Sequence, residues 1–300
     1  MNKIVVVGIG NVGLAYSYAI INSELNIDEL ILIDINEKRA LGNAMDLSHA
    51  SVFSKSKIKV KKGDYSDCKD AKIVVICAGY NQKDNETRLD LINKNCKIMK
   101  EIVLNTVSNG FNGIFLVATN PVDIMTYVTR KYSNFSSSKV IGSGTVLDTA
   151  RLRYLLSEKL QINPNNIHAY VIGEHGDSEF VIWSKAEAGV VPINKILPND
   201  DLEVIEHETK VLAYRIIDCK GETSYGIGSS LARITRAILN NEEIVLTVSA
   251  PVDDIYIGMP AVINKNGVKG VMKISLSKEE KEKLENSKNI IKNAMNNMEV

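Results

Sequence analysis

The sequence of 300 residues has few cysteines, no excess of either charge and no long apolar run. Its four cysteines are scattered, with no CxxC pair or zinc-type Cys/His cluster, so we expect a reduced, cytoplasmic protein without a disulfide scaffold. The 36 basic residues balance 36 acidic ones, so the chain has no net positive charge to attract nucleic acid or an anionic membrane, and proteins that bind either are disfavoured. No uninterrupted apolar stretch approaches the ~20 residues of a membrane span, and glycines interrupt the apolar N-terminal segment, so we expect neither a membrane helix nor a signal peptide.

The first half of the sequence alternates short runs of β-branched residues with longer helical segments. Apolar runs without a polar face are typical of parallel strands covered by helices on both sides. Six such runs occupy residues 4–7, 30–33, 58–60, 73–77, 114–117 and 140–141. We therefore predict an α/β fold with a doubly wound parallel sheet over residues 1–142. Lysines at 55, 57, 59 and 61 alternate beside the third run, which indicates the solvent face of an edge strand and not a nucleic-acid stripe.

The second half mixes helical and strand periods. A helix is predicted to start near residue 145 and to run past residue 160, and helical periodicity also covers residues 202–219 and 278–298. Strand-like runs cover 180–183, 244–248, 256–264 and 268–274. The last two runs, joined by Lys265-Asn266-Gly267, predict a hairpin. We therefore predict an α+β domain over residues 143–300.

The motif GIGNVG at residues 8–13 follows the first strand and opens a helical segment. There the glycines allow a tight turn, close approach of a pyrophosphate and close helix packing, and the helix N-terminus offers N–H donors to phosphate. Asp34 ends the second strand, where a carboxylate can hold ribose hydroxyls and repel a 2′-phosphate, which favours NAD over NADP. A turn-forming aspartate is the alternative. The motif is not a P-loop, because Leu14-Ala15 follow Gly13 where a P-loop has Lys and Ser/Thr.

Four more polar motifs follow predicted strands or begin a helix, where open α/β sheets bind ligands. They are AGYNQ at 78–82 with Arg88 after it, TNPVD at 119–123, LDTAR at 147–151 and GEHGD at 173–177. Each alone has an ordinary explanation, because Asp148 and Arg151 could form a surface ion pair worth ~0.5 kcal/mol and His175 could be a solvated loop residue. With IGSGT at 141–145, GETSYG at 221–226 and GMPAVI at 258–263, they resemble the L-lactate/malate dehydrogenase family, most closely bacterial L-lactate dehydrogenases, over nearly the whole chain.

The resemblance implies a Rossmann-type NAD-binding domain, a substrate-binding catalytic domain, and interconversion of pyruvate and L-lactate. His175 matches the acid/base, Asp148 its carboxylate partner, Arg151 the clamp on the substrate carboxylate, and Arg88 a residue that polarises the carbonyl when its segment closes. The other implied substrate-binding residues are Gln82, Asn120 and Thr223. The implied cofactor-binding residues are Gly8, Gly10, Asn11, Val12, Gly13, Asp34, Ala78, Gly79 and Asn120. The resemblance also implies a cis Asn120-Pro121 bond.

Gln82 stands where malate enzymes of this family have an arginine. A neutral amide would leave the second carboxylate of oxaloacetate without a counter-charge, so the resemblance favours pyruvate. A longer-chain 2-hydroxy acid dehydrogenase, such as a 2-hydroxyisocaproate enzyme, stays open because one methylene changes binding by only ~1 to 3 kcal/mol. Asp84-Asn85 replace a Pro-Gly pair that is usual in bacterial lactate enzymes. This difference leaves the closure of the segment and the chain-length preference of the enzyme open. It also keeps a non-catalytic dinucleotide-binding regulator as an alternative.

Arg153 and His168 match positions that bind fructose 1,6-bisphosphate in the allosterically activated bacterial enzymes, and the resemblance implies a homotetramer. An exposed helix arginine and a strand-start histidine are the alternative. Two other chemistries find little support. The sequence has no GxSxG elbow, so it does not predict a serine hydrolase. Glu174, His175 and Asp177 lie too close together in one turn to form a closed metal site, so we expect no metal.

Overall fold

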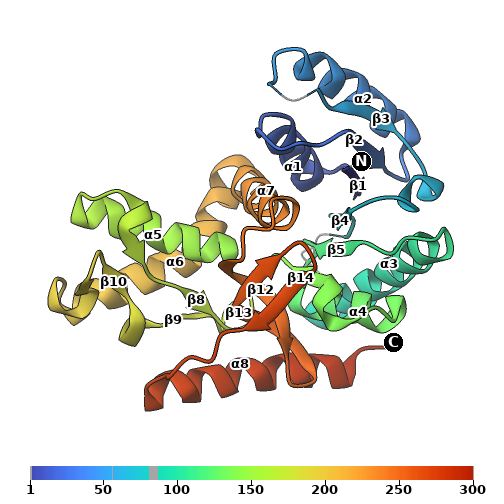
Figure 1. Cartoon of the computed structure of the whole chain (residues 1–300). Coiled ribbons are helices and arrows are strands. Elements are labelled where there is room, and N and C mark those ends of the chain that lie inside the picture. The colour runs from blue at the N-terminus through green and yellow to red at the C-terminus, as the bar shows by residue number, and fades with distance from the viewer. Residues whose placement is uncertain (1, 56, 81–86, 300) are drawn as a thin grey trace.

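A computed structural model describes residues 2–55, 57–80 and 87–299, without the side chain of Arg88. Within these residues a nine-stranded sheet runs through the molecule (Figure 1). Its strands, in spatial order, are β14 (Gly267–Val271), β13 (Ile255–Asn264), β12 (Ile244–Val252), β6 (Val140–Gly142), β5 (Ile114–Val117), β4 (Ile73–Ile76), β1 (Lys3–Val7), β2 (Glu29–Ile33) and β3 (Lys59–Lys62). The six strands from β6 to β3 are parallel, whereas β12, β13 and β14 are antiparallel.

Helices cover both faces of the parallel strands because successive side chains of these strands point to opposite faces. In β1, Ile4 and Val6 belong to one core cluster and Val5 and Val7 to another, and all four are buried. The first cluster is covered by α1 (Asn11–Ile21), α2 (Glu37–Ser51) and α7 (Tyr225–Leu239). The second is covered by α3 (Arg88–Ser108) and α4 (Val122–Ser133). The predicted doubly wound α/β fold is therefore confirmed.

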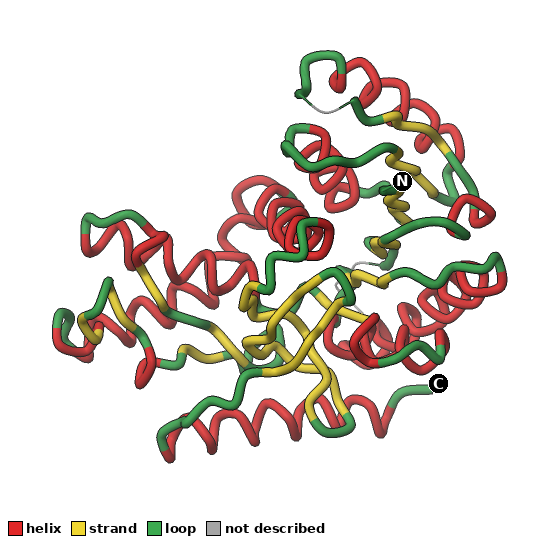
Figure 2. The backbone as a smooth tube through the Cα atoms, in the orientation of Figure 1, coloured by secondary structure: helices red, strands yellow, loops and turns green. Residues whose placement is uncertain are grey.

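The remaining elements form a second lobe beside this sheet (Figures 1 and 2). Its helices are α5 (Val146–Leu160), α6 (Asn199–Lys220) and α8 (Lys278–Asn297), the last of which runs along β13 and α4. Its short strands are β7 (Ile167–His168), β8 (Val171–Ile172), β9 (Phe180–Val181), β10 (Glu187–Ala188) and β11 (Val191–Pro192). Short 3-10 turns lie at η1 (Tyr65–Cys68), η2 (Ser137–Lys139), η3 (Pro164–Asn166), η4 (Trp183–Lys185) and η5 (Ile193–Lys195).

Most predicted elements are present, with some displaced ends. The third strand lies at 59–62, and it is an edge strand with Lys59 and Lys61 exposed, as the lysine pattern predicted. The hairpin at 265–267 and the helices α5, α6 and α8 are confirmed. The strand predicted at 180–183 is wrong beyond Val181, where the chain turns into η4, and the strand predicted at 268–274 ends at Val271. The helix α7 was not predicted.

Two absences also bear on the sequence predictions. All four cysteines lie in the described part of the chain and are free thiols. Among the described residues, no helix is both long and apolar enough to cross a membrane.

Candidate active site

The turn between β1 and α1 holds the three motif glycines in three different settings. Gly8 has a φ of +94°, and a Cβ there would lie 2.3 Å from the amide nitrogen of Ala78. A Cβ on Gly13 would lie 2.1 Å from the carbonyl oxygen of Gly8, so this glycine lets α1 pack on the turn. A Cβ on Gly10 would meet nothing within 4 Å. Gly10 therefore borders open space at the N-terminus of α1, where Asn11 and Val12 begin the helix and where N–H donors suit a pyrophosphate.

Asp34 lies directly after β2, beside this turn. Its Oδ2 atom accepts a hydrogen bond of 2.7 Å from the backbone N–H of Ile9, and its Oδ1 atom accepts one of 2.9 Å from that of Asn36. The half-buried carboxylate therefore does shape its own turn, and the same bonds fix it next to the glycine motif. Both interpretations of Asp34 fit this geometry.

The ends of β4 and β5 are joined by Asn95 of α3, which the sequence did not single out. Its buried amide oxygen accepts from the N–H of Tyr80 at 2.8 Å, and its amide nitrogen donates to the carbonyl oxygen of Asn120 at 2.8 Å. A Cβ on Gly79 would lie 2.5 Å from the methyl group of Thr119, so these two loops pack directly together. The side chain of Asn120 is exposed, and its bond to the following proline is cis, as predicted.

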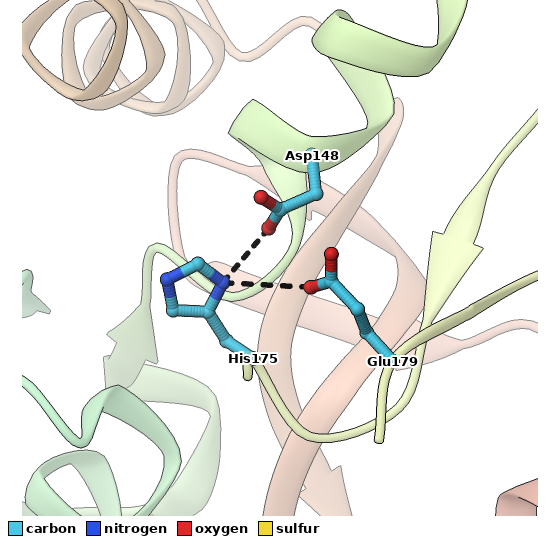
Figure 3. A group of neighbouring side chains, drawn as sticks. All are labelled: Asp148, His175 and Glu179. Carbon is cyan, nitrogen blue, oxygen red and sulfur yellow. Dashed lines mark hydrogen bonds and ion pairs between the residues drawn. The ribbon is translucent and has the colours of Figure 1, made fainter. Parts of the chain in front are cut away.

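His175 faces two carboxylates from different parts of the chain (Figure 3). Its Nδ1 atom lies 2.8 Å from Oδ2 of Asp148, in the first turn of α5, and 3.7 Å from Oε2 of Glu179. Both carboxylates are almost fully buried, whereas the imidazole is 27% exposed. The other ring nitrogen, Nε2, points away from both carboxylates in Figure 3.

Asp148 also contacts the residue that the sequence placed at the substrate carboxylate. The Nη1 atom of Arg151 donates to Oδ1 of Asp148 at 2.8 Å, and the arginine side chain is 10% exposed. This pair is buried, so the interpretation as a surface ion pair is wrong. One carboxylate thus holds an imidazole on one oxygen and a guanidinium on the other.

The backbone of His175 is held by Asp123, near the start of α4. Oδ2 of Asp123 accepts from the N–H of His175 at 2.9 Å, and Oδ1 accepts from the hydroxyl of Ser249 in β12 at 2.6 Å. Burial raises the pKa of Asp123 to about 6, although both hydrogen bonds oppose that rise. Asp123 therefore ties the histidine loop to the helix that follows Asn120 and to the central sheet.

The charges around His175 favour its protonated form. Burial alone would lower the pKa of His175, but the negative charges and hydrogen bonding of Asp148 and Glu179 outweigh it and raise that pKa well above its ordinary value. Burial would likewise raise the pKa of Asp148, but His175 and Arg151 hold it below its usual range. An imidazolium beside an ionised carboxylate is the expected state of a proton donor near neutral pH.

The same three side chains could in principle meet one metal ion. Donor atoms of Asp148, His175 and Glu179 lie within 4.8 Å of one another. Arg151, however, already places a positive charge 2.8 Å from Asp148, where a divalent cation would be repelled. The cluster suits a shared proton better than a metal.

Three predicted substrate residues are located less fully. Gln82 and Asp84-Asn85 lie outside the described residues. Arg88 is the first residue of α3, where Thr87 caps the helix by accepting from the N–H of Asp90 at 3.1 Å. Thr223 is half-buried in the turn before α7, a helix that packs against α5.

The predicted activator residues, Arg153 and His168, lie near one another on the second lobe. Nε of Arg153 donates to the carbonyl oxygen of Ala169 at 3.1 Å, directly after His168, and its guanidinium lies 4.9 Å from the ring centre of Tyr170. His168 is exposed at the end of β7. The side chain of Arg153 thus contacts the backbone of the residue that follows His168.

A glycine turn of the dinucleotide-binding type in the same chain as a histidine, a buried carboxylate and an arginine in contact is typical of a nicotinamide-dependent oxidoreductase. Comparison with known proteins narrows this class. A model of the lactate/malate dehydrogenase NAD binding domain matches residues 2–142, and a model of the lactate/malate dehydrogenase alpha/beta C-terminal domain matches residues 145–300. The chain belongs to the lactate/malate dehydrogenase family, and its cofactor is NAD.

Individual relatives cover the whole fold. An L-lactate dehydrogenase of Geobacillus sp. (strain WCH70) is 50% identical over 98% of this chain and 96% of its own length. A solved lactate dehydrogenase from a Medee basin deep-sea metagenome library is 48% identical, with a TM-score of 0.96 over 99% of this chain and 98% of that one. The minor L-lactate dehydrogenase of Enterococcus mundtii, in its ligands-bound form, is 41% identical, with a TM-score of 0.97 over 100% of this chain and 99% of that one.

Proposed function

We propose that the protein is an NAD-dependent L-lactate dehydrogenase that interconverts pyruvate and L-lactate, with His175 as the acid/base. The observation that carries the proposal is the buried Asp148, which binds both His175 and Arg151 at 2.8 Å. This contact puts a proton donor next to a cation suited to a carboxylate, as the reduction of a 2-oxo acid requires. Relatives named L-lactate dehydrogenase over nearly the whole chain support it.

The chain's own residues handle the substrate and the proton. When bound, NADH supplies a hydride to the carbonyl carbon of pyruvate, and NAD takes it back from lactate. Nε2 of His175 gives its proton to the carbonyl oxygen during reduction and recovers it during oxidation. Asp148 keeps the remaining proton on Nδ1, which leaves the lone pair of the neutral imidazole on Nε2.

Further residues orient the substrate. The guanidinium of Arg151 makes two parallel hydrogen bonds to the substrate carboxylate, a geometry that lysine cannot provide. Arg88 and Asn120 act on the reacting oxygen, and Thr223 lines the pocket. Gln82 leaves the far end of the pocket without a positive charge, which admits the methyl group of pyruvate and disfavours the second carboxylate of oxaloacetate.

We extend the proposal to the organisation and regulation of the molecule. The NAD-binding domain comprises residues 1–142 and the catalytic domain residues 143–300, with the boundary at the end of β6. The protein forms a homotetramer, and Arg153 and His168 bind a phosphate group of fructose 1,6-bisphosphate as an activator. The contact of Arg153 with the carbonyl oxygen of Ala169, the residue after His168, supports the activator site.

Initial rates of NADH oxidation test the proposal. The substrates are pyruvate, 2-oxobutyrate, 2-oxo-4-methylpentanoate and oxaloacetate, each with and without fructose 1,6-bisphosphate. We expect the highest kcat/KM with pyruvate. A branched oxo acid in first place would make the protein a broader 2-hydroxy acid dehydrogenase, and NADH binding without any turnover would make it a dinucleotide-binding regulator.

A further inference from the structure

Glu179 has no part in the mechanism above, although it lies against the acid/base. It ends the loop that carries His175, directly before β9, and its side chain is 4% exposed. Its Oε2 atom has no hydrogen-bond partner among the described residues, and Nδ1 of His175, 3.7 Å away, forms an ion pair with it. A buried carboxylate oxygen without a hydrogen bond is costly, so its position beside the imidazole calls for a physical reason.

We propose that Glu179 is a second carboxylate acting on Nδ1 of His175, a positioning residue that extends proton delivery by this imidazole into alkaline solution. The proposal rests on the proposed function for its kinetic consequence. Its structural basis is the cluster in Figure 3, in which two carboxylates from different elements converge on one ring nitrogen.

The two carboxylates are not equivalent. Arg151 neutralises Asp148, which stays ionised, whereas Glu179 has no such cation, and burial together with the charge of Asp148 raises its pKa to about 7. Glu179 is therefore mostly neutral in acid and charged in alkali. Its charge arises in the range where His175 would otherwise lose its proton, and the two groups titrate together.

Other charged or polar side chains also lie near the cluster. Each packed element contributes: α5, α4, the histidine loop itself, and α6, whose tyrosine donates to the loop. These groups are Asp148 and Arg151, Asp123, Glu174 and Asp177, and Tyr214. Asp123, with a pKa of about 6, is already largely ionised when Glu179 titrates.

The direct test is an NMR titration of the histidine rings in protein labelled with 15N-histidine. The sequence has four histidines, and a His175→Gln variant assigns the relevant signal. We expect Glu179→Gln to lower the titration midpoint of His175 by about one pH unit, the effect of one nearby partly screened charge. The other three midpoints should stay in place. An unchanged His175 midpoint would overturn the proposal.

Two further variants separate charge from structure. Asp177→Asn removes a charge from the same loop at an exposed position, so solvent should screen the loss and leave the His175 midpoint unchanged. Glu179→Asp keeps the charge with a shorter side chain and should restore part of the shift. A shift as large in Asp177→Asn as in Glu179→Gln would mean that general loop charge, not Glu179, acts on the histidine.

The kinetic test compares kcat/KM for pyruvate across pH. The ratio of wild-type to Glu179→Gln activity should be close to one near pH 6 and rise about tenfold by about pH 9. A loss of the same size at every pH would indicate a structural role and count against the proposal. The NMR titration requires no turnover, so it decides the role of Glu179 even if the wild-type protein does not reduce pyruvate.

Discussion

At the scale of single residues, the site depends on one carboxylate that compensates two cations. Asp148 is buried, and its two oxygens are each bound at 2.8 Å, one to His175 and one to Arg151. Two buried cations next to one another would repel, and the carboxylate between them removes that cost. Under the proposed roles of His175 and Arg151, we therefore expect a replacement of Asp148 to affect proton transfer and substrate binding together.

We predict that Asp148→Asn lowers kcat/KM for pyruvate by about 10²- to 10⁴-fold. Without the carboxylate the pKa of His175 falls. Pyruvate reduction needs the imidazolium, so its alkaline limit should move to lower pH, whereas lactate oxidation, which needs the neutral ring, should begin at lower pH. Rate profiles in both directions measure this effect. NADH titration serves as the control, and we expect its affinity to be unchanged because the glycine turn is separate from Asp148.

At the scale of elements, the turn between β1 and α1 offers a matched pair of substitutions. Gly8→Ala puts a side chain at a φ of +94° and against Ala78, so we expect destabilisation of about 1 to 3 kcal/mol from the backbone alone. Gly10 has a φ of −80° and free space, so Gly10→Ala should fold normally. Its methyl group would enter the space of the pyrophosphate and weaken NADH binding by roughly 5- to 100-fold.

Urea denaturation and NADH fluorescence titration distinguish the two variants. Gly8→Ala should unfold at a lower urea concentration than the wild type. Gly10→Ala should bind NADH more weakly while its stability stays that of the wild type. Wild-type NADH affinity in Gly10→Ala would show that the pyrophosphate does not approach this glycine.

Elements also show what the sequence could predict. The parallel strands were predictable because runs such as Ile73–Ile76 are buried on both faces and carry the signal in every residue. The helix α7 was missed although Leu231, Ile234 and Ile238 follow a helical period, because its glycines and serines obscure the pattern at its start. The strand predicted at 180–183 fails because two-residue strands such as β9 are too short to have a period.

The site was predictable to the extent that its residues lie in motifs. His175, Asp148 and Arg151 stand in recognisable segments, and the fold brings them together. Glu179 and Asn95 carry no motif, since each gains its place from a turn or from the packing of α3 against two loops. Contacts of this kind require the tertiary structure.

At the scale of the whole molecule, the two halves are joined too closely to act independently. Gly142 of β6 pairs with Ser249 of β12, which continues the sheet into the second half of the chain. The buried hydroxyl of Tyr16 in α1 bonds that of Thr235 in α7 at 2.9 Å. The two halves of the chain are therefore joined both through the sheet and through a buried helix–helix contact.

The surface of the single chain also favours association. Helix α6 exposes Val204, Tyr214 and Ile217, and helix α2 exposes Leu41 and Met45, which leaves apolar side chains in water on two long helices. We predict a particle of about 132 kDa by sedimentation velocity, four copies of the 33.1 kDa chain. A 33.1 kDa particle at assay concentrations would contradict the tetramer.

A tetramer would allow a ligand bound to one subunit to affect the others. If Arg153 and His168 bind a sugar bisphosphate as proposed, the ligand would stabilise the active state by the difference in its affinity for the two states, a coupling of about 1 to 3 kcal/mol. We expect fructose 1,6-bisphosphate to lower KM for pyruvate about 5- to 150-fold, and the double variant Arg153→Gln, His168→Gln to abolish this response. Lys159→Gln, on the same helix and exposed at 46%, is the charge-matched control and should respond like the wild type. An undiminished response in the double variant would place the activator elsewhere.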